Sequence, residues 1–330
     1  MIFCIVFNKK YAGKVVGGYK PGDSLEKIEA NLGTSYNESG VLGYKTKDFY
    51  RNKIKEISKK TKISEILDEN HIIVLPDETV FPTKDSEIVI ITSGIARKPG
   101  QTRLELTQTN VDILKEITPK IVKVCPNALY IIVSNPVDIL TYVFCKTTGI
   151  PEKRVIGSGT ILDTSRLRAR IAEYYSVNQK NVHAYILGEH GDTAFVPWSI
   201  ANISNVPVED YRNAVMKSDL YPEFNRDEVE DYVRKSGGRV IQRKGATFYA
   251  VSVSVCHLCK CLLNPIDTTL TVSTMLHGEY GIDDVCLSLL NIVGNKQVQG
   301  KILLPLNEQE IWSLHKSAES LKNVIKQIEI

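Results

Sequence analysis

The sequence lacks the features that mark membrane, secreted or nucleic-acid-binding proteins. No apolar run in its 330 residues is long and uncharged enough to span a bilayer, and the nearest, residues 246–263, contains His257 and Lys260. The apolar residues 1–7 have no basic region before them and no small-residue cleavage site after them, so they predict a first strand rather than a signal peptide. A net charge of +3 is too small to indicate nucleic acid or a membrane surface as a partner.

Cysteine is present but follows no regular spacing. The chain has seven cysteines, an odd count that suits free thiols in a reducing cytoplasm. Cys256, His257, Cys259 and Cys261 resemble a metal cluster, but they continue directly from an apolar stretch that predicts one buried helix. No second ligand pair follows at the spacing of a zinc site. We therefore expect packed cysteines here and no metal.

The first half of the chain alternates short apolar runs with helical patterns. With 43% hydrophobic and 24% charged residues, the composition is typical of a globular protein of one large domain or two. The runs do not alternate with polar residues, which suits strands covered on both faces. The pattern predicts a doubly wound α/β sheet, with Pro119 bending or breaking one helix. The expected strands are 71–75, 86–92 and 128–133, and the expected helices are 104–124 and 137–145.

Ligands in such sheets bind at the carboxyl ends of the strands, where Ser93-Gly94 and Ser134-Asn135 lie. The second half begins at residue 157, so we divide the chain into domains 1–156 and 157–330. The elements expected after the boundary are a helix from Thr160 to Tyr175, a strand over 182–187, two helices flanking Gly237-Gly238, two strands within 284–304 and a closing helix over 307–328.

The strand over 182–187 leads to a histidine held between two glycines and two carboxylates, in Gly188-Glu189-His190-Gly191-Asp192. Histidine exchanges a proton most readily near neutral pH, although a buried histidine that only satisfies its hydrogen bonds is the plain alternative. Asp163 and Arg166 lie three residues apart, hence on one helical face. Taken alone, that pair also fits a surface ion pair.

Hydride transfer onto a 2-keto acid needs four groups, and the sequence offers a candidate for each. Arg166 suits a bidentate grip on the carboxylate, and His190 suits a proton donor beside the carbonyl oxygen. Arg103 provides a second positive group that polarises the carbonyl. Asp163 provides a carboxylate that fixes the imidazole tautomer and favours its charged form.

Four long motifs, in order, resemble the lactate/malate dehydrogenase family. They are Ile91-Thr92-Ser93-Gly94-Ile95-Ala96-Arg97-Lys98-Pro99-Gly100-Gln101-Thr102-Arg103, Val133-Ser134-Asn135-Pro136-Val137-Asp138, Gly157-Ser158-Gly159-Thr160-Ile161-Leu162-Asp163-Thr164-Ser165-Arg166 and Gly188-Glu189-His190-Gly191-Asp192. The resemblance extends from about residue 71 to the closing helix, and several such motifs together are far more specific than one glycine motif.

The resemblance implies a Rossmann-like NAD-binding domain over 1–156, an α+β catalytic domain over 157–330, and hydride transfer between NAD(H) and a small L-2-hydroxy acid. It implies catalytic roles for His190, Asp163 and Arg103, with Arg103 on a lid that closes over substrate. The implied substrate contacts are Arg97, Arg166, Asn135 and Thr247, and the implied cofactor contacts are Gly94, Asn110, Val133 and Asn135.

Different residues of the resemblance indicate different substrates, malate or lactate. Malate-preferring members usually carry Arg at the position of Arg97, where a second substrate carboxylate pairs it, whereas lactate-preferring members carry Gln. An arginine buried without an anion is costly. Glu189 and Thr247 are instead of the lactate type, as is the chain as a whole. We therefore expect an L-lactate dehydrogenase, with malate dehydrogenase activity as the alternative.

The N-terminal part departs from the family pattern. The family opens with a Gly-x-Gly-x-x-Gly turn that cradles the NAD pyrophosphate, and residues 1–70 contain no Gly-x-Gly. A non-catalytic relative with impaired NAD binding is therefore a second alternative. The resemblance also implies a homo-oligomer, tetramer or dimer. Arg168 and His183 match the pair that binds an activating sugar bisphosphate in bacterial lactate enzymes.

Overall fold

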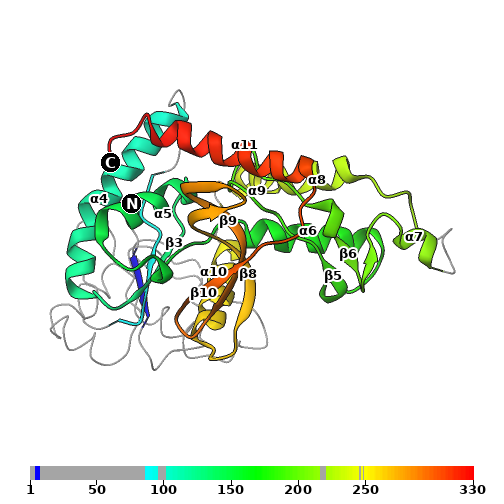
Figure 1. Cartoon of the computed structure of the whole chain (residues 1–330), viewed down its shortest axis with the longest axis horizontal. Coiled ribbons are helices and arrows are strands. Elements are labelled where there is room, and N and C mark those ends of the chain that lie inside the picture. The colour runs from blue at the N-terminus through cyan, green and yellow to red at the C-terminus, as the bar shows by residue number, and fades with distance from the viewer. Residues whose placement is uncertain (1–3, 8–85, 96–101, 216–220, 245–246, 248) are drawn as a thin grey trace.

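One mixed sheet runs through the computed structural model, which describes residues 4–7, 86–95, 102–215, 221–244, 247 and 249–330 (Figure 1). Within that part of the chain the sheet has seven strands in the order β1-β2-β3-β4-β8-β9-β10. The three central strands β2 (Ile88–Ile91), β3 (Leu129–Ile132) and β4 (Val155–Gly157) are parallel. Their positions confirm the strands expected over 86–92 and 128–133.

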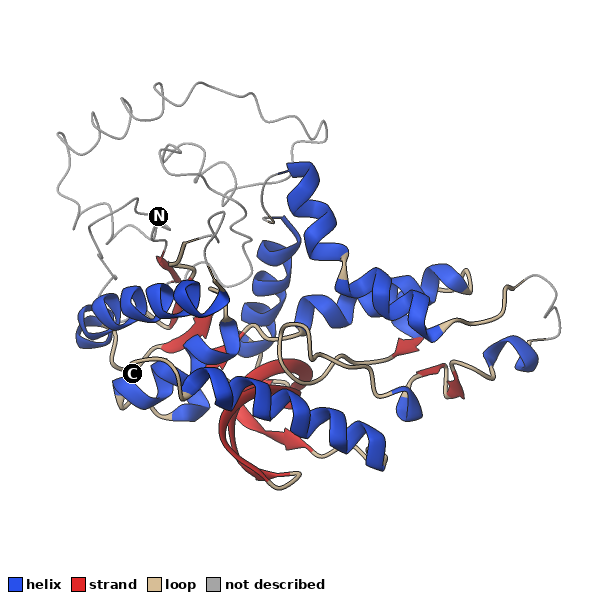
Figure 2. Ribbon diagram, turned by 90° about the horizontal axis from the view of Figure 1, so that it is seen from above, coloured by secondary structure: helices blue, strands red, loops and turns tan. Residues whose placement is uncertain are grey.

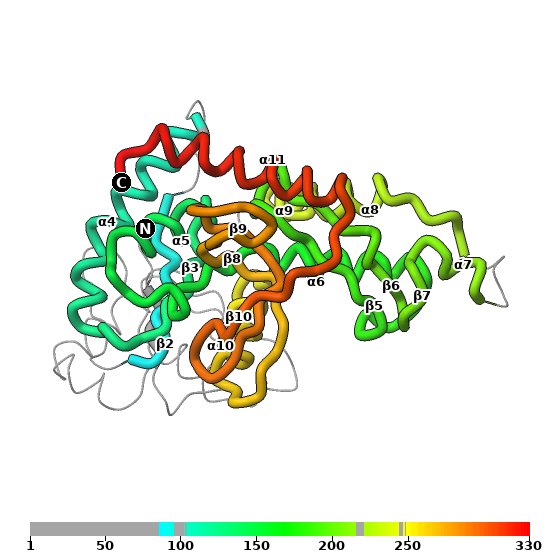
Figure 3. The backbone as a smooth tube through the Cα atoms, in the orientation of Figure 1, coloured from blue at the N-terminus to red at the C-terminus, as the bar shows by residue number. Residues whose placement is uncertain are grey.

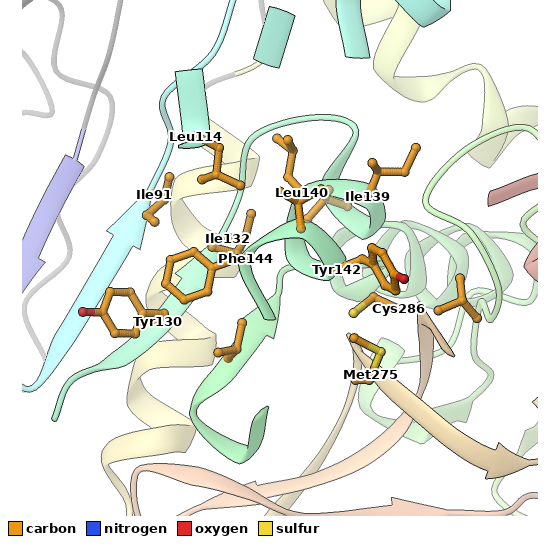
Figure 4. Packing of buried hydrophobic residues seen from close by; sticks show 14 of the residues in the cluster. Ile91, Leu114, Tyr130, Ile132, Ile139, Leu140, Tyr142, Phe144, Met275 and Cys286 are labelled. Carbon is orange, nitrogen blue, oxygen red and sulfur yellow. The ribbon is translucent and has the colours of Figure 1, made fainter. Parts of the chain in front are cut away.

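The central strands are covered on both faces, as their unalternated apolar sequences predict. Ile91 and Tyr130 pack with Leu114 and Phe144 from the helices on one face (Figure 4). Neighbouring residues of the same strands, such as Ile88, belong to a second cluster on the other face. Helices on both faces of a parallel sheet confirm the doubly wound α/β fold.

The helices α4 (Arg103–Val124) and α5 (Val137–Thr148) confirm two further expectations. Thr102 begins α4 with a capping box, in which its hydroxyl accepts from the Glu105 amide and the Glu105 carboxylate accepts from the Thr102 amide. Pro119 was expected to bend or break this helix, and a break is wrong, because α4 continues for five residues beyond it. Proline removes only one hydrogen bond of the helix, and buried neighbours such as Ile117 and Ile121 anchor both sides of it.

The N-terminal strand β1 (Cys4–Phe7) lies at the edge of the sheet and runs antiparallel to β2. It confirms a strand within residues 1–7, while its direction makes the sheet mixed rather than wholly parallel. The strand expected over 71–75 lies outside the described residues, as do the glycines of residues 1–70.

The sheet continues across the proposed domain boundary into three long antiparallel strands. Gly157 at the end of β4 pairs with Ser273 of β8, β8 pairs in turn with β9, and β9 pairs with β10. The domain division at 156 and 157 stays a prediction. Two of these strands correspond to those expected within 284–304, but β8 was missed, although its residues Thr269-Leu270-Thr271-Val272-Ser273 alternate between polar and apolar as in a strand. Their bounds are Thr268–Glu279 for β8, Ile282–Gly294 for β9 and Gln297–Ile302 for β10.

A smaller three-stranded sheet and several helices form the rest of the second half (Figure 2). The strand expected over 182–187 is wrong in length, because regular pairing ends at His183 and only isolated bridges follow at Leu187 and Gly188. The elements are α6 (Ile161–Tyr174), β5 (Val182–His183), β6 (Asn202–Ile203), β7 (Val206–Pro207), α7 (Tyr211–Ala214), α8 (Arg226–Arg234) and the 3-10 turns Gln179–Asn181 and Trp198–Ile200. A further 3-10 turn, Glu152–Arg154, precedes β4 in the first half.

Three helices complete the described chain: α9 (Ser236–Lys244), α10 (Tyr249–Leu263) and α11 (Glu308–Ile325). The closing helix is confirmed. Gly237-Gly238 does not separate two helices, because both glycines lie inside α9. The expectation of a wholly buried α10 is also wrong, since Tyr249 and Val253 are 67% and 62% exposed. None of the described helices is long and apolar enough to cross a membrane.

Gly157 allows the two halves of the sheet to approach closely, which leads to a stability prediction. A Cβ there would lie 2.9 Å from Ser273 Cβ and closer still to Thr141 Oγ1. We expect Gly157→Ala to lower the free energy of unfolding by about 1–3 kcal/mol, as overpacking does. Gly237→Ala is the control, because nothing lies within 4 Å of its Cβ. Urea denaturation of both variants measures the difference, and an equal effect would contradict the close-packing argument.

Candidate active site

The candidate site centres on the loop that carries His190, beside the long strand β9. Gly188 has a φ of +93°, a conformation that glycine adopts easily. A Cβ at Gly188 would lie 2.5 Å from Ser317 Oγ, so only glycine leaves room for that hydroxyl. The Gly188 amide donates to the Ser288 carbonyl at 3.0 Å, and the Ser288 amide donates back at 3.1 Å. This pairing places His190 just beyond the edge of β9.

The Asp163 carboxylate joins the two cationic candidates. Its Oδ2 is 2.7 Å from His190 Nδ1, and its Oδ1 accepts from Arg166 Nη1 at 3.2 Å. Asp163 and Arg166 lie on the first two turns of α6, so the helix itself sets their spacing. The side chains are 16%, 31% and 19% exposed for Asp163, His190 and Arg166. The three side chains are therefore partly buried and partly accessible to solvent.

The electrostatics of the pair favour a charged imidazole. Burial lowers the pKa of His190, but the hydrogen bond and charge of Asp163 outweigh it and leave that pKa above 6.5. Burial raises the pKa of Asp163, but the hydrogen bond to His190 and the neighbouring charges outweigh it, and the pKa lies below 3.8. Because Nδ1 is bonded to the carboxylate, Nε2 is the nitrogen left to exchange a proton with a ligand.

The carboxyl ends of β2 and β3 are tied together by one buried side chain. Asn110 accepts from the Ile95 amide at 2.8 Å and donates to the Asn135 carbonyl at 2.8 Å. Asn110 is 2% exposed, and its side chain holds the loops after β2 and β3 together. Its role as a cofactor contact stays a prediction. Asn135 is exposed and Gly94 is half-buried, at the edge where doubly wound sheets bind nucleotides. These residues fit the nicotinamide half of an NAD site.

The remaining predicted residues either lie outside the described part of the chain or have no described contact with this cluster. Arg97 and the Arg103 side chain lie outside the described residues, although Arg103 is the first residue of α4. Thr247 is half-buried between α9 and α10, and Val133 is half-buried at the end of β3. None of the described contacts joins Thr247 or Val133 to His190.

Arg168 and His183 lie close together on the far side of α6 from Asp163. The Arg168 Nε donates to the carbonyl of Ala184, the residue after His183, at 2.9 Å. The guanidinium also lies over the Tyr185 ring, 5.0 Å from its centroid. His183 is exposed on β5. The two candidates for the sugar bisphosphate site are thus neighbours.

Sequence reasoning missed two residues that hold the histidine loop. Asp138 of α5 accepts from the His190 amide at 2.7 Å, and Ser317 of α11 accepts from the Glu189 amide at 2.9 Å. Asp138 had no distinctive signal, because an acidic residue in the first turn of a helix is common. Ser317 had none, since it lies 128 residues along the chain from Glu189.

Two family models match most of the chain. Residues 53–157 match the lactate/malate dehydrogenase NAD binding domain, and residues 160–330 match the lactate/malate dehydrogenase alpha/beta C-terminal domain. The chain belongs to the lactate/malate dehydrogenase family. The match confirms the predicted family, the dehydrogenase class of enzyme and NAD as the cofactor. The NAD-domain match begins at residue 53, so much of the region without the glycine turn precedes it.

Individual relatives agree with this assignment. L-lactate dehydrogenase 1 of Clostridium acetobutylicum is 41% identical over 281 residues, which are 83% of this chain and 89% of the relative. L-lactate dehydrogenase of Clostridium botulinum strain 657 is 46% identical over 244 residues, 74% of this chain and 76% of the relative. Both relatives are named for lactate.

Solved structures show the same fold. The minor L-lactate dehydrogenase of Enterococcus mundtii in its ligands-bound form superposes with a TM-score of 0.70, at 37% identity, over 75% of this chain and 78% of that one. L-lactate dehydrogenase of Clostridium thermocellum superposes with a TM-score of 0.66, at 37% identity, over 74% and 78%. Both confirm the predicted fold class.

Proposed function

We propose that this family member is an NAD-dependent L-lactate dehydrogenase, which interconverts pyruvate and L-lactate. The observation that carries the proposal is the Asp163 carboxylate, which holds the His190 imidazole at 2.7 Å and the Arg166 guanidinium at 3.2 Å. A proton donor and a carboxylate clamp are thereby fixed side by side. The relatives described above are named L-lactate dehydrogenases, which supports the same acid.

Arg166 binds the substrate carboxylate in this proposal. A guanidinium grips a carboxylate through two parallel hydrogen bonds, and only one of the Arg166 nitrogens is engaged by Asp163 in the described contacts. Its helix is anchored by buried Leu167 and Ile171, which fixes where the substrate lies. Orientation of this kind converts binding energy into a productive approach of the reacting atoms.

His190 gives a proton to the carbonyl oxygen during pyruvate reduction, and takes it back during lactate oxidation. When bound, NAD(H) supplies or accepts the hydride at the substrate carbon, at the edge where Gly94, Val133 and Asn135 lie. Asp163 stabilises the imidazolium before the transfer and keeps Nε2 facing the substrate. Arg103, at the start of α4, is proposed to polarise the carbonyl.

The direct test is oxidation of NADH, followed by its absorbance, with pyruvate as the substrate. Turnover is the expected result. Folded protein that binds NADH, as shown by a rise in melting temperature, but reduces neither pyruvate nor oxaloacetate would overturn the proposal. The non-catalytic alternative, with impaired NAD binding, predicts instead that millimolar NADH does not raise the melting temperature. The joined Asp163, His190 and Arg166 support the catalytic proposal against it.

Arg97 is the one residue that favours a second substrate. Its identity matches the malate-preferring type, while the relatives named above do not favour malate as the main acid. We expect appreciable turnover of oxaloacetate, whose second carboxylate pairs with Arg97. Arg97→Gln is then expected to raise the pyruvate-to-oxaloacetate ratio of kcat/KM by about 10²-fold, as the loss of a charged pair implies. An unchanged ratio would remove this role from Arg97.

The pKa of His190 predicts opposite pH profiles for the two directions. Reduction needs the protonated imidazole, whose pKa lies above 6.5 because of Asp163. We expect kcat/KM for pyruvate to be level at pH values below that pKa and to fall by about tenfold per pH unit above it. Lactate oxidation needs the neutral imidazole and should rise over the same range. A pyruvate profile that rises toward alkaline pH would contradict the assignment of the proton donor.

A homo-oligomer is also proposed, on the strength of apolar side chains at the surface. Tyr232, Ile241, Tyr249 and Val253 are 40–67% exposed on α8, α9 and α10, which follow one another along the chain. Large exposed apolar side chains that gather into a patch mark protein interfaces. Light scattering of the purified chain measures the assembly, and a monomer at micromolar concentration would contradict it.

Two finer assignments complete the proposal. A sugar bisphosphate activator is supported by the nearness of Arg168 to His183. It would be tested by adding a sugar bisphosphate and measuring the rate at low pyruvate concentration, with Arg168→Gln as the variant expected not to respond.

A cytoplasmic location is supported by the described cysteines, which are all free thiols. Among the described residues no cluster of potential metal ligands occurs, and no step of the proposed chemistry uses a metal.

A further inference from the structure

The loop that bears His190 is held by two different helices at consecutive amides. Ser317 of α11 accepts from the Glu189 amide at 2.9 Å, and Asp138 of α5 accepts from the His190 amide at 2.7 Å. In Figure 3, α5, β9 and α11 lie side by side. The main chain of His190 is therefore positioned from outside α6, which supplies only its ring partner.

The two helices hold the loop with different chemistry. Ser317 is a neutral hydroxyl that also donates to the Thr193 carbonyl at 2.9 Å, so it ties both ends of the loop. Asp138 is a carboxylic acid that is only 2% exposed. A neutral acceptor would satisfy the His190 amide equally well, and a buried carboxylate is costly unless it has a specific partner. The hydrogen bond to the His190 amide therefore does not explain why residue 138 is a carboxylic acid, and we look for a role of its negative charge.

Charged and titratable groups face Asp138 from the elements packed against it. The histidine loop contributes His190 and Glu189, β8 contributes the Ser273 hydroxyl, and β9 contributes the Cys286 thiol. His190 is the one group among these whose protonated form carries a positive charge. Burial raises the pKa of Asp138 to about 6, although Ser273 and the His190 amide oppose the shift and Glu189 adds to it.

We propose that Asp138 is a positioning residue for the proton donor: it fixes the main chain of His190 and, when ionised, its negative charge stabilises the imidazolium. His190 then lies between two carboxylates, Asp163 on its ring nitrogen and Asp138 on its amide. Both raise the pKa of His190, while burial and Arg166 lower it. The catalytic role of Asp138 rests on the proposed function of His190. Its effect on the pKa of His190 does not depend on that function.

Asp138→Asn separates the charge from the hydrogen bond. The asparagine oxygen still accepts from the His190 amide, so the loop keeps its anchor while the negative charge is lost. We expect the imidazole pKa of His190, measured by NMR on the full chain with labelled histidine, to fall by on the order of half a unit. The alkaline fall of kcat/KM for pyruvate should move to lower pH by the same amount, while kcat at low pH stays within a few-fold.

Ser317→Ala is the matched control, because it removes the neighbouring anchor without changing a charge. It should lower kcat through a displaced loop and leave the His190 pKa in place. An unmoved pKa in Asp138→Asn, or an equal shift in both variants, would overturn the charge role. The NMR titration needs no turnover, so an inactive wild-type enzyme would defeat the proposed function and still leave this inference testable.

The wild-type protein offers a second reading if Asp138→Asn fails to fold. The imidazole senses a neighbouring charge, so the chemical shift of His190 should depart from the titration curve of a single group over the range where Asp138 titrates, near pH 6. A curve that a single group describes fully across that range would contradict an effect of the Asp138 charge and overturn the proposal.

Discussion

His190→Asn is expected to lower kcat/KM for pyruvate by about 10²–10⁴-fold, the range in which a positioned proton donor contributes to catalysis. Asparagine can still accept or donate a hydrogen bond near Asp163, but it cannot deliver a proton. NADH binding should be retained, because the described cofactor edge lies on β2 and β3. Steady-state kinetics and NADH-induced stabilisation measure the two quantities separately.

His315→Asn is the control for that experiment. His315 is exposed on α11, where its Nε2 lies 2.9 Å from the Tyr280 carbonyl and away from the Asp163 cluster. Its replacement should leave kcat/KM unchanged within about twofold, as surface substitutions usually do. If both variants lost activity equally, the loss would reflect general damage and the assignment of His190 would fail.

Arg166→Gln is expected to raise KM for pyruvate by roughly 30-fold to several thousand-fold. Truncating one partner of a buried, hydrogen-bonded charge pair costs about 2–5 kcal/mol, and Arg166 is 19% exposed. Arg166→Lys keeps the charge but loses the planar, bidentate grip, so it should recover only part of the affinity. Initial rates over a wide range of pyruvate concentrations measure both effects.

Arg170→Gln is the matched control on the same helix. Arg170 is bound to Glu173 at 2.9 Å and to Glu228 at 2.6 Å, one turn further from the site. Its loss should affect stability slightly and leave KM unchanged. A rise in KM as large as that of Arg166→Gln would show that α6 responds as a whole to lost charge, and would contradict a specific clamp.

The family match and the contacts in the site answer different questions, namely which class of enzyme this is and how its proton donor is prepared. The matched domains establish a dehydrogenase that uses NAD. The Asp163 contacts explain how such an enzyme prepares a charged imidazole, because a carboxylate at 2.7 Å offsets the cost of burying that charge. In our proposal Asp138 is a second carboxylate that, with Asp163, opposes the effect of burial on the pKa of His190.

The sequence alone determined the elements whose signals are local. Apolar runs without alternation predicted β2 and β3, and the helical period predicted α4, α5 and α11. The spacing of Asp163 and Arg166 likewise follows from one helix, because residues three apart always share a face. The other predicted catalytic residues were found from sequence motifs, which contain the types of residue that the chemistry needs.

Only the tertiary structure decided how distant residues meet. Nothing local indicates that Asp138 and Ser317 hold neighbouring amides of the His190 loop, since 52 and 128 residues separate the bonded pairs. Packing also overrode local signals, because α4 continues through Pro119 and the regular strand β5 ends at His183. The exposed Tyr249 and Val253 show the same limit, since apolar residues in a helix do not by themselves reveal which face is covered. Periodicity is encoded residue by residue, whereas contacts across the fold depend on how all the elements pack together.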